Sequence, residues 1–435
     1  MISLKMKYGR DEMLAAVPNQ HFMGFIEGKK QANSNTEEEI IQKALNNPIE
    51  SRSLVEIVYP GDTICIVISD ITRAWQKMSL YLPYIVEELN RGGVKDEDIT
   101  FLCATGSHRK QSRREHSILL GKDLAKRFRV IDHDCRDKEA MVYVGETSYG
   151  TPVWINEIAM KSTHIVLTGA IVYHDLAGWS GGKKSILPGI AAYESIMANH
   201  GLSLSKTAGG GIHPKVGCGI AIDNPIHEDM LEAANLVKPS FIFNVIMDYR
   251  GKIGAAVAGD YIKAHKIGQE KVNAIDGVKI KEKSDLVIVS SGGYPKDINL
   301  YQASKALSNA KEAVKKGGTI ILVSQCIEGF GDKGVQEIIQ DYSENYSQEI
   351  ELRNNYSIAK YTGYLIAKIA EDYKVILVSE IHPSSLKSID IQVVTTLKEA
   401  IVKAKEDKKE PQKTYCMPYG SNTLPKLDSI TIPLR

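Results

Sequence analysis

The chain has 435 residues, of which 43% are hydrophobic, and its formal net charge is +1. This length and apolar content can support two or three domains with proper cores. A net charge so close to zero argues against a protein held to nucleic acid or to a membrane surface by bulk electrostatics, so any functional charge must be local.

Cysteine usage and the N-terminal segment indicate a cellular compartment. The six cysteines lie far apart and include no CxxC pair, which is typical of reduced, mostly buried thiols in a cytosolic protein. The N-terminal segment lacks the apolar core of a signal peptide, and no apolar run approaches the roughly 18 to 20 residues of a membrane span. We therefore expect a cytoplasmic protein with no membrane segment and no nucleic-acid partner.

The first part of the chain alternates predicted strands and helices. A short strand pair and a helix at residues 36–46 come first. The run TICIVISD (63–70) is continuously apolar, which is typical of a strand covered on both faces in a parallel sheet. An amphipathic helix is expected from about Met78 to Arg91, followed by a strand that ends near His108 and another at residues 128–134.

The segment HDLAGWSGGKKSILPGIAAYESIMANH (174–200) follows an apolar strand at residues 164–172. After its glycines and two lysines come a Ser-Ile-Leu-Pro-Gly turn and a short helical run that ends on His200. A strand, a glycine-rich turn and a helix start in this order present backbone N–H groups and the positive end of a helix dipole to an anion, most often a phosphate. The spacing does not match a P-loop, because two lysines stand where Gly-Lys should be. In the alternative interpretation the glycines form a tight crossover turn and the lysines are a solvated face.

The second part of the chain predicts another α/β unit. An ordered loop is expected at residues 201–219, and the composition becomes charged at residues 278–284, where we place a domain boundary. Strands and helices alternate again beyond it, with helices at residues 300–315 and 358–371. We therefore predict an α/β fold with two α/β domains, 1–277 and 278–435, facing each other across an active-site cleft, and allow for the last strand returning to the first domain.

Several polar residues fall at predicted strand ends, where ligands of α/β domains gather. They are Asp70, Thr72, Arg73, His108 and His174. A lone histidine at such an end is more often a hydrogen-bonding residue than a catalyst, but two of them beside an arginine and a lysine-bearing turn favour proton transfer. The histidines show no familiar metal-binding spacing such as HExxH, so the residue pattern alone predicts no metal.

Four separated motifs resemble the nickel-dependent lactate racemase family, whose members racemise or epimerise 2-hydroxy acids. They are SDITR (69–73), ATGSHR (104–109), the segment at 174–200 and GGYPKDINLYQASK (292–305). The third motif is long and specific, and the resemblance spans nearly the whole chain.

The resemblance implies a cofactor and its attachment. The cofactor would be a nickel-pincer nucleotide, Ni(II) pyridinium-3-thioamide-5-thiocarboxylic acid mononucleotide, in which two sulfurs and one carbon bind nickel. Lys184 would hold one sulfur arm covalently through a thioamide, and His200 would supply the fourth nickel ligand, a donor set that suits near-square-planar nickel. Separate maturation proteins would make and insert the nucleotide.

The resemblance also implies roles for the strand-end residues. His108 and His174 would be the acid/base pair for a hydride transfer that turns the 2-hydroxy acid into a 2-keto acid and back. The expected carboxylate-binding residues are Arg73, Lys305, Gln302 and Tyr301. The residues expected to anchor the nucleotide are Asp70, Thr72 and the backbone of Ser180, Gly181 and Gly182.

Departures from the family pattern bear on the substrate. Asp175 and Leu176 follow His174 where aromatic residues are expected, Tyr361 replaces an expected tryptophan, and Trp75 follows the Arg73 motif. We therefore predict a substrate larger or more polar than lactate, such as a sugar acid. In the alternative, Asp175 points into a hydrogen-bond network and lactate is the substrate.

Two other classes of function remain open from the sequence. One is a non-catalytic nucleotide- or phosphate-binding protein, which would leave His108 and His174 without a role. The other is a related racemase that uses a tightly bound nicotinamide, against which the lack of a GxGxxG turn after a strand argues.

Overall fold

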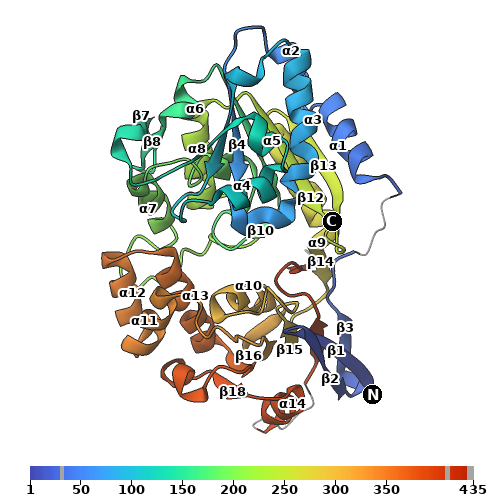
Figure 1. Cartoon of the computed structure of the whole chain (residues 1–435). Coiled ribbons are helices and arrows are strands. Elements are labelled where there is room, and N and C mark those ends of the chain that lie inside the picture. The colour runs from blue at the N-terminus through green and yellow to red at the C-terminus, as the bar shows by residue number, and fades with distance from the viewer. Residues whose placement is uncertain (30–33, 407–411, 429–435) are drawn as a thin grey trace, which may run out of the picture. The chain divides into compact units, whose positions relative to one another are not determined.

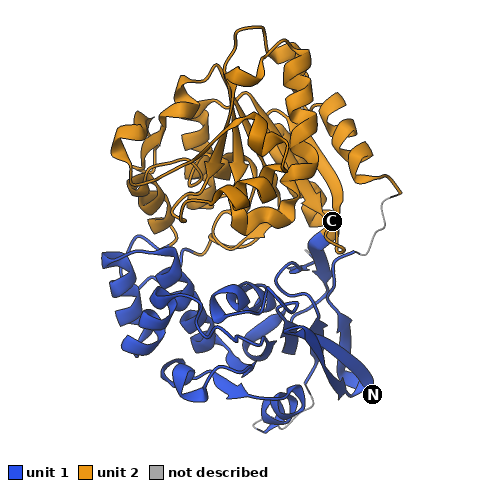
Figure 2. Cartoon of the chain, viewed as in Figure 1, with its two compact units in different colours: residues 1–29, 204–213, 276–435 blue, residues 30–203, 214–275 orange. Residues whose placement is uncertain are grey.

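The structure is a computed structural model that describes residues 1–29, 34–406 and 412–428 (Figure 1). Contacts divide the chain into unit 1, with residues 1–29, 204–213 and 276–435, and unit 2, with residues 30–203 and 214–275 (Figure 2). Each unit contains a six-stranded sheet covered by helices. The predicted α/β fold with two α/β domains is confirmed.

The units differ from the predicted ranges in where two segments belong. Near the predicted boundary at 277/278 the chain enters unit 1 at Asp276, but residues 1–29 and 204–213 also belong to unit 1. The first segment does so because β3 (Phe22–Phe25) pairs in parallel with β19 (Thr414–Met417). The last strand, β20 (Leu424–Leu427), pairs with β14 (Gly277–Ile280), also within unit 1.

The sheet of unit 2 has the order β13-β12-β9-β4-β5-β6, and all its neighbours are parallel except β12 and β13. Its strands are β4 (Ile64–Ser69), β5 (Ile99–Ala104), β6 (Arg129–Asp132), β9 (His164–Ala170), β12 (Phe241–Met247) and β13 (Ile253–Gly259). β4, which comes first along the chain among these six strands, lies inside the sheet, with β5 on one side and β9 on the other. Ligands of such sheets bind at the carboxyl ends where the strand order reverses, which is here between β4 and β9.

Helices pack on this sheet as the apolar patterns predict. The helix α3 (Met78–Arg91) has the predicted bounds and buries Tyr81, whose ring contacts Phe243 of β12 at 5.0 Å between centroids. The other helices of unit 2 are α1 (Glu37–Asn46), α2 (Leu54–Ile57), α4 (Arg113–Leu120), α5 (Leu124–Arg127), α6 (Glu157–Lys161), α7 (Tyr193–Gly201), α8 (Pro225–Val237) and α9 (Lys263–Asp276). A hairpin of β7 (Met141–Glu146) and β8 (Pro152–Asn156) completes the unit.

The segment after β9 contains the expected turns and, beyond them, the expected helix. A two-residue ribbon of β10 (Tyr173–His174) and β11 (Gly178–Trp179) comes first, and Gly182–Ser185 then form a 3-10 turn. The helical run predicted to end on His200 is confirmed as α7, which spans Tyr193–Gly201. It does not start directly at the glycine-rich turn, because Pro188 lacks an N–H and disfavours helical geometry at the preceding residue.

The sheet of unit 1 has the order β18-β17-β16-β15-β19-β3, with every neighbouring pair parallel. Its other strands are β15 (Ser284–Ser290), β16 (Val314–Val323), β17 (Lys374–Val378) and β18 (Gln392–Val394), and the chain opens with the hairpin β1 (Ile2–Tyr8) and β2 (Asp11–Val17). The helices are α10 (Leu300–Ala310), α11 (Lys333–Asp341), α12 (Asn345–Asn354), α13 (Ile358–Asp372) and α14 (Leu397–Lys405). The helix predicted at 300–315 ends at Ala310, because Val314 already pairs with Ser284.

Two expectations concern the whole chain. The six cysteines are free thiols, and five of them are buried. Within the described residues no helix is both long enough and apolar enough to cross a membrane.

A buried carboxylate explains why residues 204–213 belong to unit 1. Glu349 of α12, only 2% exposed, accepts hydrogen bonds from the backbone N–H groups of Gly209 and Gly211, each at 3.0 Å. Arg353, one turn later, pairs with Glu349 at 2.6 Å and donates to the carbonyl oxygen of Ser205 at 2.7 Å. The loop that follows α7 is thereby fixed on a helix more than 130 residues away in the sequence.

Three buried histidines of unit 2 are held neutral. His133, His227 and His265 each hydrogen-bond one ring nitrogen to a carbonyl oxygen at 2.8 to 2.9 Å. Burial lowers the pKa of His133 and of His227 to about 4 and that of His265 to about 3. These imidazoles therefore remain uncharged in the folded protein at neutral pH.

These three histidines predict acid sensitivity. Their pKa values are lower in the folded state than the ordinary value of about 6.5, so between pH 6.5 and 4 the unfolded chain binds more protons and stability rises with pH. We expect the free energy of unfolding to fall by up to roughly 4 kcal/mol per pH unit below pH 6. Urea denaturation at several pH values measures this slope.

The matched variant is His133→Gln, which removes one of the three groups. Its slope should be shallower than that of the wild type by up to about 1.4 kcal/mol per pH unit, which is the contribution of one proton. Equal slopes in both proteins would contradict the assignment of His133 as a buried neutral imidazole.

Candidate active site

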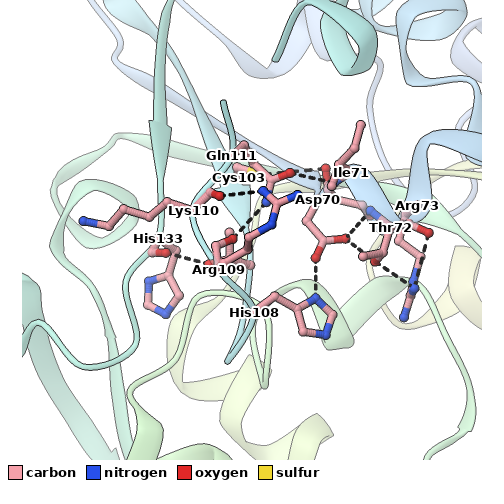
Figure 3. A network of polar contacts seen from close by, with 12 residues as sticks. Asp70, Ile71, Thr72, Arg73, Cys103, His108, Arg109, Lys110, Gln111 and His133 are labelled. Carbon is pink, nitrogen blue, oxygen red and sulfur yellow. Dashed lines mark hydrogen bonds and ion pairs between the residues drawn. The ribbon is translucent and has the colours of Figure 1, made fainter. Parts of the chain in front are cut away.

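A carboxylate and a histidine meet at the carboxyl ends of β4 and β5. Asp70 directly follows β4, and its Oδ2 makes a short hydrogen bond with Nδ1 of His108, which lies in the turn after β5 (Figure 3). The Asp70 side chain is 4% exposed, whereas that of His108 is 49% exposed. A carboxylate that holds Nδ1 fixes the ring and its tautomer, so Nε2 is the nitrogen available for proton exchange.

The same carboxylate anchors Thr72 and, through it, Arg73. Oδ1 of Asp70 accepts from the backbone N–H of Thr72 at 3.1 Å and from its hydroxyl at 2.5 Å. Nη1 of Arg73 donates to the Thr72 hydroxyl oxygen at 2.9 Å, and the guanidinium is exposed. Burial opposes ionisation of Asp70, but its hydrogen bonds with His108 and Thr72 and the nearby Arg73 charge outweigh this and lower its pKa. Asp70 is thus a buried, ionised carboxylate.

A glutamine ties the loops that carry these residues. Oε1 of Gln111 accepts from the backbone N–H of Ile71 at 3.0 Å (Figure 3). The backbone N–H of Gln111 donates to Oδ2 of Asp132 at 2.7 Å. Asp132 ends β6 and pairs with His116 at 2.8 Å. The sequence analysis did not single out Gln111, because nothing in the local pattern indicates a partner 40 residues away.

His174 lies on the ribbon after β9 and reaches Lys184. Its Nδ1 accepts from the backbone N–H groups of Leu176 at 3.1 Å and Ala177 at 3.3 Å. Its Nε2 lies 2.8 Å from Nζ of Lys184. Asp175 has its Oδ1 3.3 Å from His174 Nδ1, on the side of the ring away from the lysine contact. The structure therefore brings His174 and Lys184, which are ten positions apart in the sequence, into direct contact.

The glycine-rich turn is packed closely against the unit. The N–H of Ser180 donates to Val172 at 2.9 Å, and that of Gly182 donates to Oδ1 of Asn244 at 2.8 Å. Gly181 has φ +76°, and a Cβ there would lie 2.8 Å from the same Asn244 oxygen. The backbone N–H groups of Ser180 and Gly182, two of the three predicted to anchor a nucleotide, are thus already hydrogen-bonded within the protein. Close packing explains the glycine at position 181. Asn244 is a polar residue inside the apolar run of β12, and that interruption was the signal available in the sequence.

The first of the two lysines is buried against a histidine. Lys183 is 5% exposed, and its Nζ donates to Nε2 of His227 at 2.9 Å, since Nδ1 of that ring donates to Ala177. Burial, together with the charge of the neighbouring Lys184, lowers the pKa of Lys183 to about 7. The sequence analysis did not weigh His227, which the apolar face of α8 carries inward.

His200 lies on α7 and is 2% exposed. Its Nδ1 donates to the carbonyl oxygen of Ile196 at 2.9 Å, which leaves the lone pair on Nε2. Burial, and next the charge of Lys184, lower its pKa to about 3. Neutral imidazole with one nitrogen already bonded to a carbonyl is the form that binds metals. Within the described residues no three His, Cys, Asp or Glu side chains gather around a metal position, so His200 would need ligands from elsewhere.

The predicted carboxylate-binding residues of the second half lie on α10 of unit 1. Tyr301, Gln302 and Lys305 lie on its first two turns, and Nζ of Lys305 donates to Oε1 of Gln302 at 2.8 Å. Residues three and four apart share one face of a helix, so these side chains form one group. Arg73 and the other predicted site residues belong to unit 2.

The two aromatic residues that depart from the family pattern, Tyr361 and Trp75, belong to different units. Tyr361 on α13 is buried and stacks on Tyr356 with 6.4 Å between ring centroids. Trp75 of unit 2 is 44% exposed, close to the Asp70 group in sequence.

Comparison with known proteins finds relatives along nearly the whole chain. Residues 8–211 match the lactate racemase N-terminal domain, and residues 279–424 match the lactate racemase C-terminal domain. A lactate racemase of Lactiplantibacillus plantarum is 32% identical over 433 residues, 98% of this chain and 100% of that protein. A lactate racemase of Thermoanaerobacterium thermosaccharolyticum is 33% identical over 386 residues, 87% of this chain and 88% of that protein.

Solved structures agree. The lactate racemase apoprotein of T. thermosaccharolyticum superposes with a TM-score of 0.89 at 30% identity, covering 98% of this chain and 100% of that one. A Thermotoga maritima protein shares the fold alone, with a TM-score of 0.61 at 19% identity, 93% of this chain and 100% of that one being covered. Matched in both halves and nearly end to end, the chain belongs to the lactate racemase family.

Proposed function

We propose that this protein is an isomerase that inverts C2 of a 2-hydroxy acid by hydride transfer to a covalently held nickel-pincer nucleotide. The relatives above carry the name lactate racemase. The observation that carries the proposal is the position of two histidines beyond the carboxyl ends of β5 and β9, the two strands that flank β4 in one sheet. His108 and His174 each have Nδ1 bonded by the protein, which leaves Nε2 of each ring for proton exchange.

The residues present fit the proposed cofactor. His200 is a neutral imidazole with a lone pair on Nε2, and the described residues offer no further cluster of metal ligands, which suits a group that brings three donors of its own. Lys184 lies on the turn after the His174 ribbon, and its half-buried amine is the proposed attachment point of the nucleotide. When bound, the nucleotide supplies the hydride acceptor and donor.

The chain's own residues then handle protons and orientation. Nε2 of His108 takes the hydroxyl proton of one enantiomer, and the buried Asp70 carboxylate stabilises the imidazolium that forms. His174 is the other member of the acid/base pair, for the enantiomer whose hydroxyl lies differently, and with its proton on Nε2 it acts first as the acid. Arg73 pairs with the substrate carboxylate. Lys305, Gln302 and Tyr301, which form one group on α10, are proposed as further carboxylate-binding residues. Thr72 and the turn at Ser180, Gly181 and Gly182 would line the nucleotide site.

For the substrate we propose a 2-hydroxy acid larger or more polar than lactate, because Asp175 follows His174 where an apolar pocket would need an aromatic residue. Lactate itself is the second candidate, and one observation favours it. The Asp175 carboxylate lies 3.3 Å from His174 Nδ1 and thus faces the histidine. Maturation proteins in the cytoplasm are the proposed partners, since the nucleotide must be made and inserted by other enzymes.

The cofactor proposal predicts a covalent adduct. Protein produced together with the maturation proteins should carry about one nickel per chain and a nucleotide mass on the peptide that contains Lys184. Intact and peptide mass spectrometry with nickel analysis measure both. Nickel-free protein with an unmodified Lys184 under these conditions would contradict the hydride-transfer mechanism and favour a phosphate-binding protein.

The Asp70–His108 pair predicts a specific loss of turnover. Asp70→Asn keeps the shape of the side chain but removes the charge that stabilises the imidazolium, so kcat should fall by about 10²- to 10⁴-fold with little change in KM. Steady-state kinetics on nickel-loaded protein measure the split.

The matched control is Asp62→Asn. Asp62 lies before β4, at the opposite edge of the sheet, and its Oδ2 pairs with His164 at 3.2 Å. This variant should retain kcat within about 3-fold. An Asp70→Asn enzyme as active as the Asp62→Asn enzyme would disprove the role of Asp70.

The substrate proposal predicts a preference. A panel of enantiopure 2-hydroxy acids should give a higher kcat/KM for a polyhydroxylated acid than for lactate, and Asp175→Ala should lower the former by about 10-fold or more. The ratio for lactate should change less. Lactate as the best substrate by a wide margin would decide for the second candidate.

A further inference from the structure

The contact between His174 and Lys184 has a direction that the surrounding backbone determines. The two atoms, Nε2 of His174 and Nζ of Lys184, lie 2.8 Å apart, and both side chains are half-buried. One hydrogen must lie between the two nitrogens. It belongs either to the imidazole or to the lysine, and the two cases differ in the charge of Lys184.

The other ring nitrogen decides between these cases. Nδ1 of His174 faces two backbone N–H groups, those of Leu176 at 3.1 Å and Ala177 at 3.3 Å. A nitrogen that accepts from two donors cannot itself carry a proton. The single proton of the neutral ring therefore lies on Nε2 and points at Lys184, so the lysine nitrogen must accept it with a lone pair.

Asp175 is the group that could favour the opposite tautomer. Its Oδ1 lies 3.3 Å from His174 Nδ1, longer than the roughly 2.7 to 2.9 Å of a charge-assisted hydrogen bond. A proton on Nδ1 would also meet two N–H groups at close range and leave them without an acceptor. The backbone geometry thus favours Nε2–H despite this carboxylate.

The neighbouring residue works in the same direction. Lys183 is buried next to Lys184 and donates to the neutral imidazole of His227. Two adjacent ammonium groups in a region with little solvent are unfavourable. Burial is the main cause that lowers the pKa of Lys183 itself to about 7.

We propose that His174 has a second role before the cofactor is attached: its Nε2–H holds the Lys184 side chain as an uncharged amine that can be acylated. This inference rests on the proposed function, because it concerns how Lys184 becomes modified. The lone pair of the amine forms the new C–N bond to a thiocarboxyl carbon. The condensation converts that group into a thioamide and releases one water, which takes the oxygen and two hydrogens.

The test uses the protein without cofactor. Trace acetic anhydride at pH 7 acetylates uncharged amines and releases acetic acid, and peptide mass spectrometry gives the rate at each lysine. At this pH roughly one ordinary lysine in 2,500 is uncharged. Lys184 should therefore react at least about 10-fold faster than Lys316 and Lys333, whose side chains are 82% and 88% exposed. A Lys184 rate no higher than theirs would overturn the proposal.

Two substitutions at His174 separate its two nitrogens. Asparagine places an oxygen near the Nδ1 position and can still accept from the backbone, but it has no donor at the Nε2 position. Glutamine places an N–H donor near Nε2. We expect His174→Asn to lower the Lys184 rate by about 10-fold or more, and His174→Gln to keep it within about 3-fold of the wild type.

Two further variants complete the comparison. His108→Asn removes the histidine that contacts Asp70, and Asp175→Asn removes the carboxylate near Nδ1. Neither should change the Lys184 rate by more than about 3-fold. An unchanged rate in His174→Asn, or a loss of rate in Asp175→Asn equal to that in His174→Asn, would contradict the assigned direction of the hydrogen bond.

Unchanged labelling rates at the other lysines show that a variant is folded. If a variant does not fold, the rate of Lys184 relative to Lys316 and Lys333 in the wild-type protein decides the test. The result is also separable from the proposed function. A reactive Lys184 that never carries a nickel nucleotide would overturn the function but leave this inference standing. A nickel adduct on Lys184, together with a low acetylation rate of Lys184 before attachment, would overturn this inference but support the proposed function.

Discussion

The adjacency of β4, β5 and β9 at their carboxyl ends is the constraint on which the site depends. Parallel pairing of β4 with both neighbours places the residues that follow each strand at one edge of one sheet. Asp70 can therefore bond His108, although 38 residues separate them. The ribbon after β9 starts from the same edge and carries His174 to Lys184. Each reactive group is thus fixed by a strand that the apolar core holds in place.

Burial gives these groups their chemical form. His200 is kept neutral by burial and by the hydrogen bond from Nδ1 to Ile196, which is the state a metal requires. Asp70 stays ionised because His108, Thr72 and Arg73 compensate for its burial. The protein therefore holds a neutral imidazole at His200 and an ionised carboxylate at Asp70 beside His108.

Sequence patterns predicted the strands, since continuous apolar runs such as Ile64–Ser69 indicate burial on both faces, and they predicted the bounds of Met78–Arg91 from its amphipathic period. They did not predict partners far apart in the chain. Asn244 accepts a hydrogen bond from the N–H of Gly182, 62 residues away, and His227 accepts one from Lys183, 44 residues away. The helical run that ends near His200 was also predicted. The assignment of residues 204–213 to unit 1 depends on Glu349, and no local pattern encodes it.

The central claim is that C2 loses and regains its hydrogen as a hydride rather than as a proton. Racemisation of one enantiomer of the 2-hydroxy acid by the nickel-loaded enzyme in D₂O, followed by mass spectrometry of both enantiomers, tests it most directly. The hydride route predicts products that keep the original hydrogen at C2, because a hydride held on the cofactor does not exchange with solvent. Deuterium at C2 that appears in step with racemisation would contradict it and indicate proton abstraction by His108 and His174.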